Sequence, residues 1–188
     1  MLVDTCRTKY REKILNACKP YDIQLLILTH GHIDHIQNAV YLSKKLNVPI
    51  AMNRADIELI ESNMHQNLAA KTILGKIVLA ASVKSFREEN IPAFVPTVFL
   101  EEGDALEEYG ISARILSVPG HTKGSIAIEV ADKDVIVGDA LMNMFYPTVS
   151  MLYHDRENML ESAKKIEKLG DRTIYFGHGK PAANKHWK

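Results

Sequence analysis

Residues 23–35 read IQLLILTHGHIDH, a short apolar run that ends in three histidines and an aspartate. The run at residues 23–28 is rich in leucine and isoleucine and bounded by turn residues, which predicts a buried strand. Extended backbone puts the side chains of His30 and His32 on one side, where both can ligate one ion. Asp34 opens a predicted helix over residues 34–46, and its carboxylate suits the positive end of that helix. Asp34 and His35 can therefore face a second ion.

This pattern is specific. His-x-His-x-Asp-His arises by accident in about one chain per thousand of this composition. Loops at strand ends let a rigid scaffold bring distant ligands to one point. Three further motifs each follow a predicted strand, namely Gly120-His121-Thr122, Gly138-Asp139 and Gly177-His178-Gly179.

These motifs predict a metal site. A catalytic zinc ion takes three protein ligands and keeps one position open, so His121 is expected to join His30 and His32. Nitrogen and oxygen ligands without cysteine suit Zn(II), Mn(II) or Fe(II). We expect a second ion to bind Asp34, His35 and His178, with Asp139 bridging the two ions. The remaining histidines, His65, His154 and His186, lie outside the motifs.

The rest of the chain mixes helices and strands. Without a linker or repeat, 188 residues predict a single domain over residues 1–188, of the α/β class with packed sheets. Helices are expected at residues 7–18, 34–46, 54–61, within 63–92 and at 156–169. Strands are expected at residues 2–4, 23–28, 48–52, 97–100, 111–118, 125–130, 135–137 and 173–176.

The composition limits the classes of binding partner that are expected. The 23 basic residues balance 23 acidic ones, which argues against nucleic acid or an anionic membrane as the main partner. Cys6 and Cys18 form neither a C-x-x-C motif nor a disulfide framework. No run approaches the roughly 18 apolar residues of a membrane span, and the first residues are too charged for a signal peptide. We therefore expect a cytoplasmic protein that acts on a small molecule.

The motif order HGHIDH, GHT-x-G, GD and GH resembles the metallo-β-lactamase superfamily over almost the whole chain, and Leu2-Val3-Asp4-Thr5 is similar to its usual first motif. The resemblance implies an αβ/βα sandwich of two mixed β-sheets flanked by helices, with metals at one edge between the sheets. Two departures stand out. The family normally has strands before this first motif, and Cys6 replaces its usual glycine. We therefore expect an N-terminally shortened fold whose exposed edge at residues 2–4 pairs with a second copy in a homodimer.

Within the superfamily, the seven ligands match those of glyoxalase II. The commonest zinc β-lactamases differ, with cysteine where Asp139 stands, and the flavodiiron oxygen reductases have glutamate at His32. The resemblance implies a metallo-hydrolase with two Zn(II) ions, for which iron or manganese could substitute. A bridging hydroxide would cleave a thioester, ester or lactone. Asp34 is the expected catalytic residue, because it both ligates and orients the nucleophile.

Substrate contacts are harder to place. Lys123, Tyr146 and Tyr153 could bind substrate, and Thr122 could fix the ring of His121. Residues 63–92 could form a lid or a packing helix pair. Two alternatives to hydrolysis stay open: a mononuclear iron persulfide dioxygenase, which would use two histidines and one carboxylate, and a non-catalytic metal-binding member of the fold.

Overall fold

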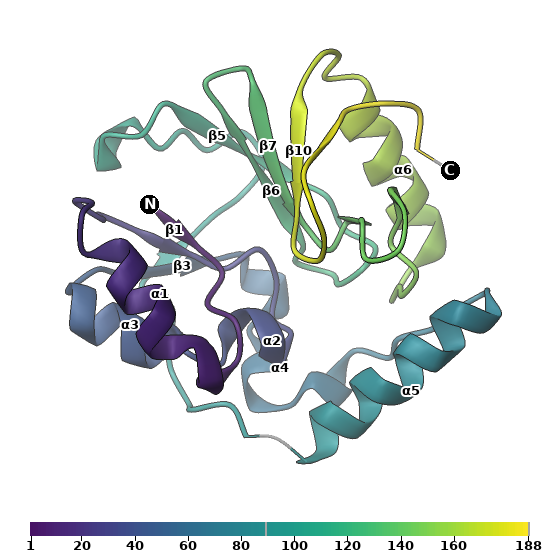
Figure 1. The fold of residues 1–188 in the computed structure, drawn as a ribbon, viewed down its shortest axis with the longest axis horizontal. Coiled ribbons are helices and arrows are strands. Elements are labelled where there is room, and N and C mark those ends of the chain that lie inside the picture. Colours follow the sequence, from purple (N-terminus) through teal and green to yellow (C-terminus); the bar gives the residue numbers. More distant parts are fainter. Residues whose placement is uncertain (89, 188) are drawn as a thin grey trace.

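The computed structural model describes residues 1–88 and 90–187. Two β-sheets lie one over the other with helices outside them (Figure 1). Among the described residues, the first sheet holds four parallel strands, in the order β1 (Leu2–Val3), β2 (Leu26–Ile27), β3 (Ile50–Met52) and β4 (Val98–Phe99). The second sheet is mixed, in the order β11 (Ala182–Ala183), β10 (Thr173–Phe176), β7 (Asp134–Gly138), β6 (Ile126–Val130) and β5 (Ala113–Ser117). A short antiparallel pair joins β8 (Leu141–Met142) to β9 (Thr148–Val149).

Helices cover the outer faces of both sheets. α1 (Arg11–Cys18) and α3 (Ala39–Leu46) lie beneath the first sheet, and α6 (Arg156–Glu167) covers the second (Figure 1). The longest helix, α5 (Ile73–Glu88), lies apart from the sheets at the lower right of the same view. The remaining helical turns are α2 (Ile33–Ile36), α4 (Glu58–Glu61), and 3₁₀ turns at Thr8–Tyr10, Arg54–Asp56, Asn63–His65 and Glu107–Tyr109.

Strand β2 shows why the apolar run of the sequence is continuous. Successive side chains of a strand point to opposite faces. Leu25 and Ile27 pack between the two sheets, with Ile115 of β5 among their neighbours. Leu26 and Leu28 pack on the helical side of the sheet. Because both faces are buried, the strand has no polar face, as in other parallel sheets. These layers confirm the αβ/βα sandwich.

Several helical predictions differ from the structure in detail. The helices expected over residues 7–18 and 54–61 each begin as a 3₁₀ turn, followed by α1 and α4 respectively. The helix expected over residues 34–46 is divided into α2 and α3. At the break, the side-chain amide of Asn38 donates to the carbonyl oxygens of Thr5, Cys6 and Arg7, and so ties the chain after β1 to this turn. Within residues 63–88 and 90–92, the structure has one long helix, α5, preceded by a 3₁₀ turn.

The structure also adds three strands. β8, β9 and β11 have two residues each, too few for an alternating pattern to show in the sequence. In the part of the chain that the structure describes, we find no helix with the length and apolarity needed to cross a membrane.

Candidate metal centre

The proposed ligands follow strands whose carboxyl ends meet at one edge of the molecule. β1 and β2 are parallel, so Asp4 and His30 follow them at the same end. In the second sheet, β10 runs parallel to β7, and β5 and β7 are both antiparallel to β6. The loops after β5, β7 and β10 therefore emerge on one side, and they carry His121, Asp139 and His178. This is the edge at which open α/β sheets commonly bind ligands.

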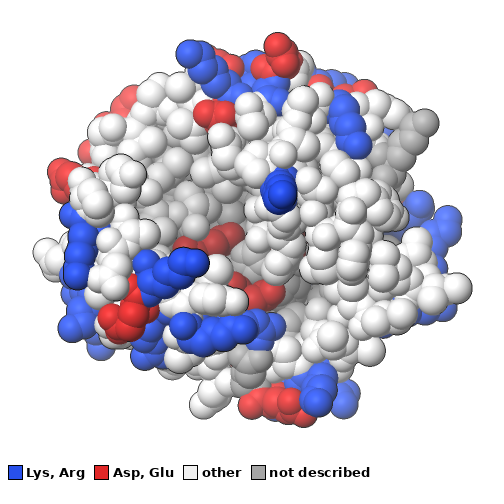
Figure 2. All heavy atoms as spheres, viewed as in Figure 1, with Lys and Arg blue, Asp and Glu red and all other residues white. Residues whose placement is uncertain are grey.

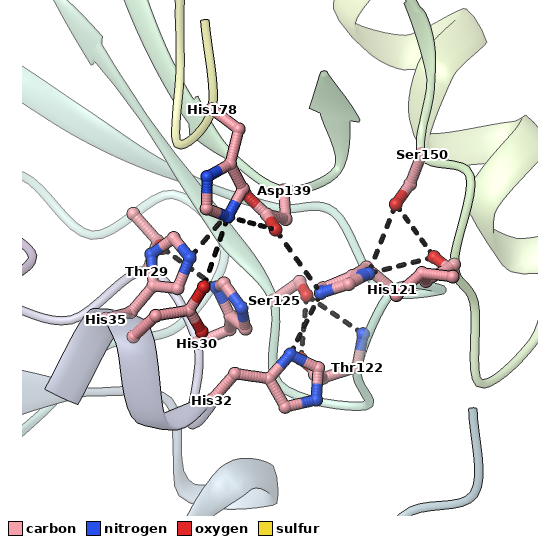
Figure 3. A network of polar contacts seen from close by, with 12 residues as sticks. Thr29, His30, His32, His35, His121, Thr122, Ser125, Asp139, Ser150 and His178 are labelled. Carbon is pink, nitrogen blue, oxygen red and sulfur yellow. Dashed lines mark hydrogen bonds and ion pairs between the residues drawn. The ribbon is translucent and has the colours of Figure 1, made fainter. Parts of the chain in front are cut away.

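All seven predicted ligands come together there. In Figure 3, the rings of His35, His121 and His178 lie around the carboxylate of Asp139, and the ring of His32 lies beside that of His121. Within each of three groups, the ligand atoms lie within 4.8 Å of one another: His30, His32 and His121; His30, His35 and Asp139; and Asp34, His35 and His178.

Asp139 lies between the two proposed ion positions. One carboxylate oxygen, Oδ2, is 3.7 Å from His121 Nε2 and 3.4 Å from His178 Nε2. The other, Oδ1, is 3.6 Å from His35 Nε2. In the first group, His32 Nδ1 and His121 Nε2 are 3.0 Å apart. The single carboxylate thus contacts residues of both groups, the arrangement expected of a bridging ligand.

Several of these atoms lack the partners that buried polar atoms normally have. The Nε2 atoms of His30 and His35 and Oδ1 of Asp139 are buried and find no hydrogen-bond partner within residues 1–88 and 90–187. Such burial is costly unless something compensates for it. A side chain at Gly177 would also collide with Asp139 and His35. The residues present therefore fit a divalent cation.

Side chains behind the ligands fix their orientation. Asp4 accepts a hydrogen bond from His35 Nδ1 at 2.7 Å, so that Nε2 of the same ring faces the other ligands. Asp4 also accepts hydrogen bonds from the backbone N–H and the hydroxyl of Thr29, both at 2.8 Å. Asp4, from the Leu2-Val3-Asp4-Thr5 motif, thus acts through His35 and is not itself one of the proposed ligands.

Asp56 is a residue that sequence reasoning missed. Its buried carboxylate accepts hydrogen bonds from the backbone N–H groups of Gly31 (3.0 Å) and Gly124 (2.7 Å). It also accepts them from the Thr122 hydroxyl (2.7 Å) and the Gln66 amide (3.1 Å). Asp56 therefore joins the loop of His30 and His32 to the loop of His121. No pattern in the sequence separates it from any other aspartate in a short helical turn.

Comparison with known proteins shows the family of this chain. A family model described as the metallo-beta-lactamase superfamily matches residues 1–178. The chain belongs to the metallo-β-lactamase superfamily. Members of this superfamily are generally hydrolytic and bind divalent metals, and this chain carries the His and Asp groups able to hold one.

Two relatives and one solved structure are similar to this chain. It is 32% identical over 175 residues to the hydroxyacylglutathione hydrolase GloC of Haemophilus influenzae, covering 89% of this chain and 75% of that protein. It is 29% identical over 175 residues to hydroxyacylglutathione hydrolase 1 of Vibrio vulnificus, covering 89% of this chain and 53% of that protein. The crystal structure of TTHA1623 in a di-iron-bound form shares the fold, with a TM-score of 0.65 at 22% identity over 96% of this chain and 82% of that one.

The two groups of ligands in this metallo-β-lactamase fold differ electrostatically. Burial lowers the pKa values of His30 and His32 well below their ordinary value, and the neighbouring imidazoles lower them further. Burial likewise lowers the pKa of His121. These three rings are therefore neutral near pH 7, the form in which a ring nitrogen can bind a cation.

The second group contains charged pairs. Burial alone would lower the pKa of His35, but the carboxylates of Asp4 and Asp139 outweigh it and raise that pKa to about 10. Burial would raise the pKa of Asp34, yet its hydrogen bond with His178 and the charge of His35 hold that pKa well below its usual range. The Oδ2 atom of Asp34 lies 3.3 Å from His178 Nε2. Asp34 is thus ionised at neutral pH.

The sequence suggested that Thr122 fixes the ring of His121, but in the structure Thr122 does not contact that ring through a hydrogen bond. The hydroxyl of Thr122 bonds to Asp56 and contacts Ser125 Oγ at 2.7 Å. Nδ1 of His121 instead faces the carbonyl oxygen of Leu152 at 2.8 Å and Ser150 Oγ at 3.2 Å. Thr122 holds the loop, and residues 150 and 152 hold the ring.

The three proposed substrate contacts lie away from the centre. Lys123 forms an exposed ion pair with Glu58, at 2.8 Å, and lies outside the cavities next to the ligands. Tyr146 and Tyr153 line a separate cavity of about 290 Å³, which none of the seven proposed ligands lines. The structure brings none of the three to the ligands.

Two cavities open onto the centre, and both are lined in part by Arg7, Asp34 and His178. Acidic atoms are visible deep in the hollow between the sheets (Figure 2). The β1 cavity, of about 420 Å³, is lined by Leu2, Val3, Asp4, Cys6, Arg7, Tyr10, Ile14, Asp34, His35, Ile136, Gly138, Phe176, Gly177 and His178. The α5 cavity, of about 330 Å³, is lined by Arg7, His32, Asp34, Leu68, Ile77, Val78, Ala81, Ser82, Phe86, His121, Asp139, Met142, Met144, Leu152 and His178.

Proposed function

We propose that this chain is a hydrolase of a thioester, ester or lactone that works with two divalent cations, Zn(II) in the first instance. The observation that carries the proposal is the position of Asp139, a buried carboxylate in contact with both groups of ligands. The similarity to two hydroxyacylglutathione hydrolases supports a thioester among the substrates. Cys6 and Cys18 are free thiols, which supports a proposed site of action in the reducing cytoplasm.

The residues have separate tasks. One cation would be held by His30, His32 and His121. The other would be held by Asp34, His35 and His178. Asp139 would bind both cations. Bound cations supply Lewis acidity that polarises a carbonyl and lowers the pKa of water from about 15.7 to about 7. Ionised Asp34 accepts a hydrogen bond from the attacking water and orients it toward the carbonyl carbon. For a thioester, the elements of water add across the C–S bond, releasing a carboxylate, a thiol and a proton.

Metal content and activity test the proposal together. We expect about two divalent ions per chain by elemental analysis after reconstitution, and hydrolysis of at least one member of a panel of thioesters, esters and lactones. Hydroxyacylglutathione belongs on that panel because of the relatives. Activity should fall on chelation and return with added metal. Full occupancy by two ions without turnover of any panel member would contradict the proposed function.

A second candidate, a mononuclear iron persulfide dioxygenase, is favoured by one specific group. His30, His35 and Asp139 provide two histidines and one carboxylate within 4.8 Å, the ligand type of non-haem iron oxygenases. One iron per chain, with oxygen consumed in the presence of glutathione persulfide, would support this candidate over hydrolysis.

A further inference from the structure

We propose that the α5 cavity binds an unbranched apolar acyl chain, so that the preferred substrate is an alkanoyl thioester or ester. The inference rests on the hydrolytic function proposed above and names the substrate class of that same site. Among the described residues that line the cavity beyond the proposed ligands, all but Arg7 and Ser82 are apolar. A small polar acyl group would leave this apolar wall without a partner.

The wall has two sides. One face of α5 supplies Ile77, Val78 and Ala81. Ala81 lies four residues after Ile77 and three after Val78, a spacing that keeps these side chains in a row on one face of the helix. Met142 of β8 and Leu152, which follows β9, also line the cavity. Methionine and leucine adapt readily to flexible apolar ligands. A chain lying between these sides would contact apolar atoms along both.

The position of the cavity also fixes the direction of the chain. At one end of the row, the ring of Phe86 stacks on His32, with centroids 5.1 Å apart and planes at 25°. At the other end lies Ile77, nine residues earlier on the helix and thus roughly 13 Å along its axis. A carbonyl placed at the ligands therefore directs its chain along α5, over a length much greater than that of an acetyl group.

The far end of the row is exposed in the free protein. Ile77 is 63% exposed and Met144 is 39% exposed. Exposed apolar side chains that adjoin a cavity commonly mark a surface that a ligand covers. A longer acyl chain would remove both from water. Each buried methylene should raise kcat/KM about fourfold, until the chain passes Ile77.

A chain-length series on the metal-loaded full chain tests the inference. The substrates are N-acetylcysteamine thioesters of acetate, butanoate, hexanoate and octanoate, which share one neutral leaving group. We expect kcat/KM to rise with each lengthening step. Ala81→Phe should lower the octanoyl-to-acetyl ratio of kcat/KM at least tenfold, because the ring fills the cavity. Ala80→Phe is the matched control: Ala80 lies on the outer face of α5, away from this cavity.

A binding experiment provides a readout independent of turnover. Isothermal titration with butanoate, hexanoate and octanoate, the products of the series, should show affinity rising with length in the wild type and in Ala80→Phe. Ala81→Phe should lose that dependence. An octanoyl-to-acetyl ratio equal in the two variants, or affinities independent of length in the wild type, would overturn the inference while hydrolysis stands. If no thioester, ester or lactone is hydrolysed, the proposed function is wrong, and the titrations alone decide whether the cavity binds an acyl chain.

Discussion

At the scale of single residues, the carboxylate of Asp56 connects the loops that carry His30, His32 and His121. Each of the four groups that face it is a hydrogen-bond donor. These donors can be satisfied only by a side chain in which both terminal atoms accept hydrogen bonds, and an ionised carboxylate is such a group. The amide of an asparagine has the same shape, but its NH2 group would face one of these four donors.

Asp56→Asn should therefore lower the free energy of unfolding by about 1–3 kcal/mol. It should also weaken metal binding about 10–100-fold, since the loops that hold the ligands lose their common support. Chemical denaturation and titration with a competing chelator measure the two effects. Asp171→Asn, at an exposed position, is the matched control. Metal affinity equal in both variants would show that Asp56 has no influence on the centre.

Asp34→Asn should leave the fold almost intact and reduce kcat at least about 100-fold. The amide cannot accept a proton from water, and it loses the charge that pairs with His178. Occupancy of the second ion should fall more than that of the first. Steady-state kinetics together with elemental analysis measure this. Turnover at the wild-type rate with full metal content would refute the role assigned to Asp34.

The convergence of the seven proposed ligands could be predicted from the sequence, because their residue types are uncommon and their spacing follows from strand and turn geometry. Their supports could not. Asp56 meets Gly124 across 68 positions of sequence, and Ser150 meets His121 across 29. Lys123 shows the same limit: its place beside His121-Thr122 suggested substrate binding, whereas in the structure its side chain pairs with Glu58. Contacts of this kind arise only from tertiary packing.

At the scale of elements, a buried carboxylate ties three parts of the second sheet together. Glu129 of β6 stands opposite Arg114 of β5 in the strand register and accepts a hydrogen bond from its Nε at 2.6 Å. Arg172, just before β10, donates from Nε to the other oxygen at 2.9 Å. Burial alone would raise the pKa of Glu129, but the two guanidinium groups lower it below its ordinary value of 4.5.

Glu129→Gln should therefore lower the free energy of unfolding by about 2 kcal/mol at pH 7. The carboxylate has a lower pKa in the folded chain than in the unfolded one, so its contribution is complete above pH 4.5 and lost as the pH falls through the folded value. Urea denaturation from pH 7 to pH 3 should show the wild-type and variant curves converging in acid. Glu161→Gln, which breaks an exposed pair, should leave the pH dependence nearly unchanged. Parallel curves for wild type and Glu129→Gln would contradict this.

Long elements were predicted better than breaks and short strands. The strand at Thr173–Phe176 and the helix beginning at Arg156 agree with the sequence pattern, because each carries a clear period and a clear boundary. The side chain of Asp155 caps that helix by accepting from two backbone N–H groups. The division of α2 from α3 depends on the hydrogen bonds of Asn38 to a distant loop, which no local pattern contains.

At the scale of the whole molecule, β1 is one of the two edge strands of the first sheet, as far as the structure describes the chain. An apolar groove of about 450 Å³ beside it is lined by residues that include Leu2, Ile136 and Tyr175. Open edges tend to pair with other chains, and a two-fold axis is the simplest way to close such a contact. We therefore expect a homodimer by light scattering. Tyr175→Lys should shift it toward monomer, whereas Tyr21→Lys, at a position 70% exposed elsewhere, should not. A monodisperse wild-type monomer at high concentration would exclude this assembly.

Asp139 lies between proposed ligands that come from both sheets, and this position affects the stability and abundance of the protein in the cell. His30, His32, Asp34 and His35 follow the first sheet, whereas His121, Asp139 and His178 belong to loops of the second. Bound ions would act as a non-covalent cross-link between the two halves, worth about 2.7 kcal/mol at a hundredfold excess over Kd. Chelation should therefore lower the melting temperature as well as the activity. In a metal-starved cell the chain would unfold more often and be degraded, so its abundance would follow the metal supply.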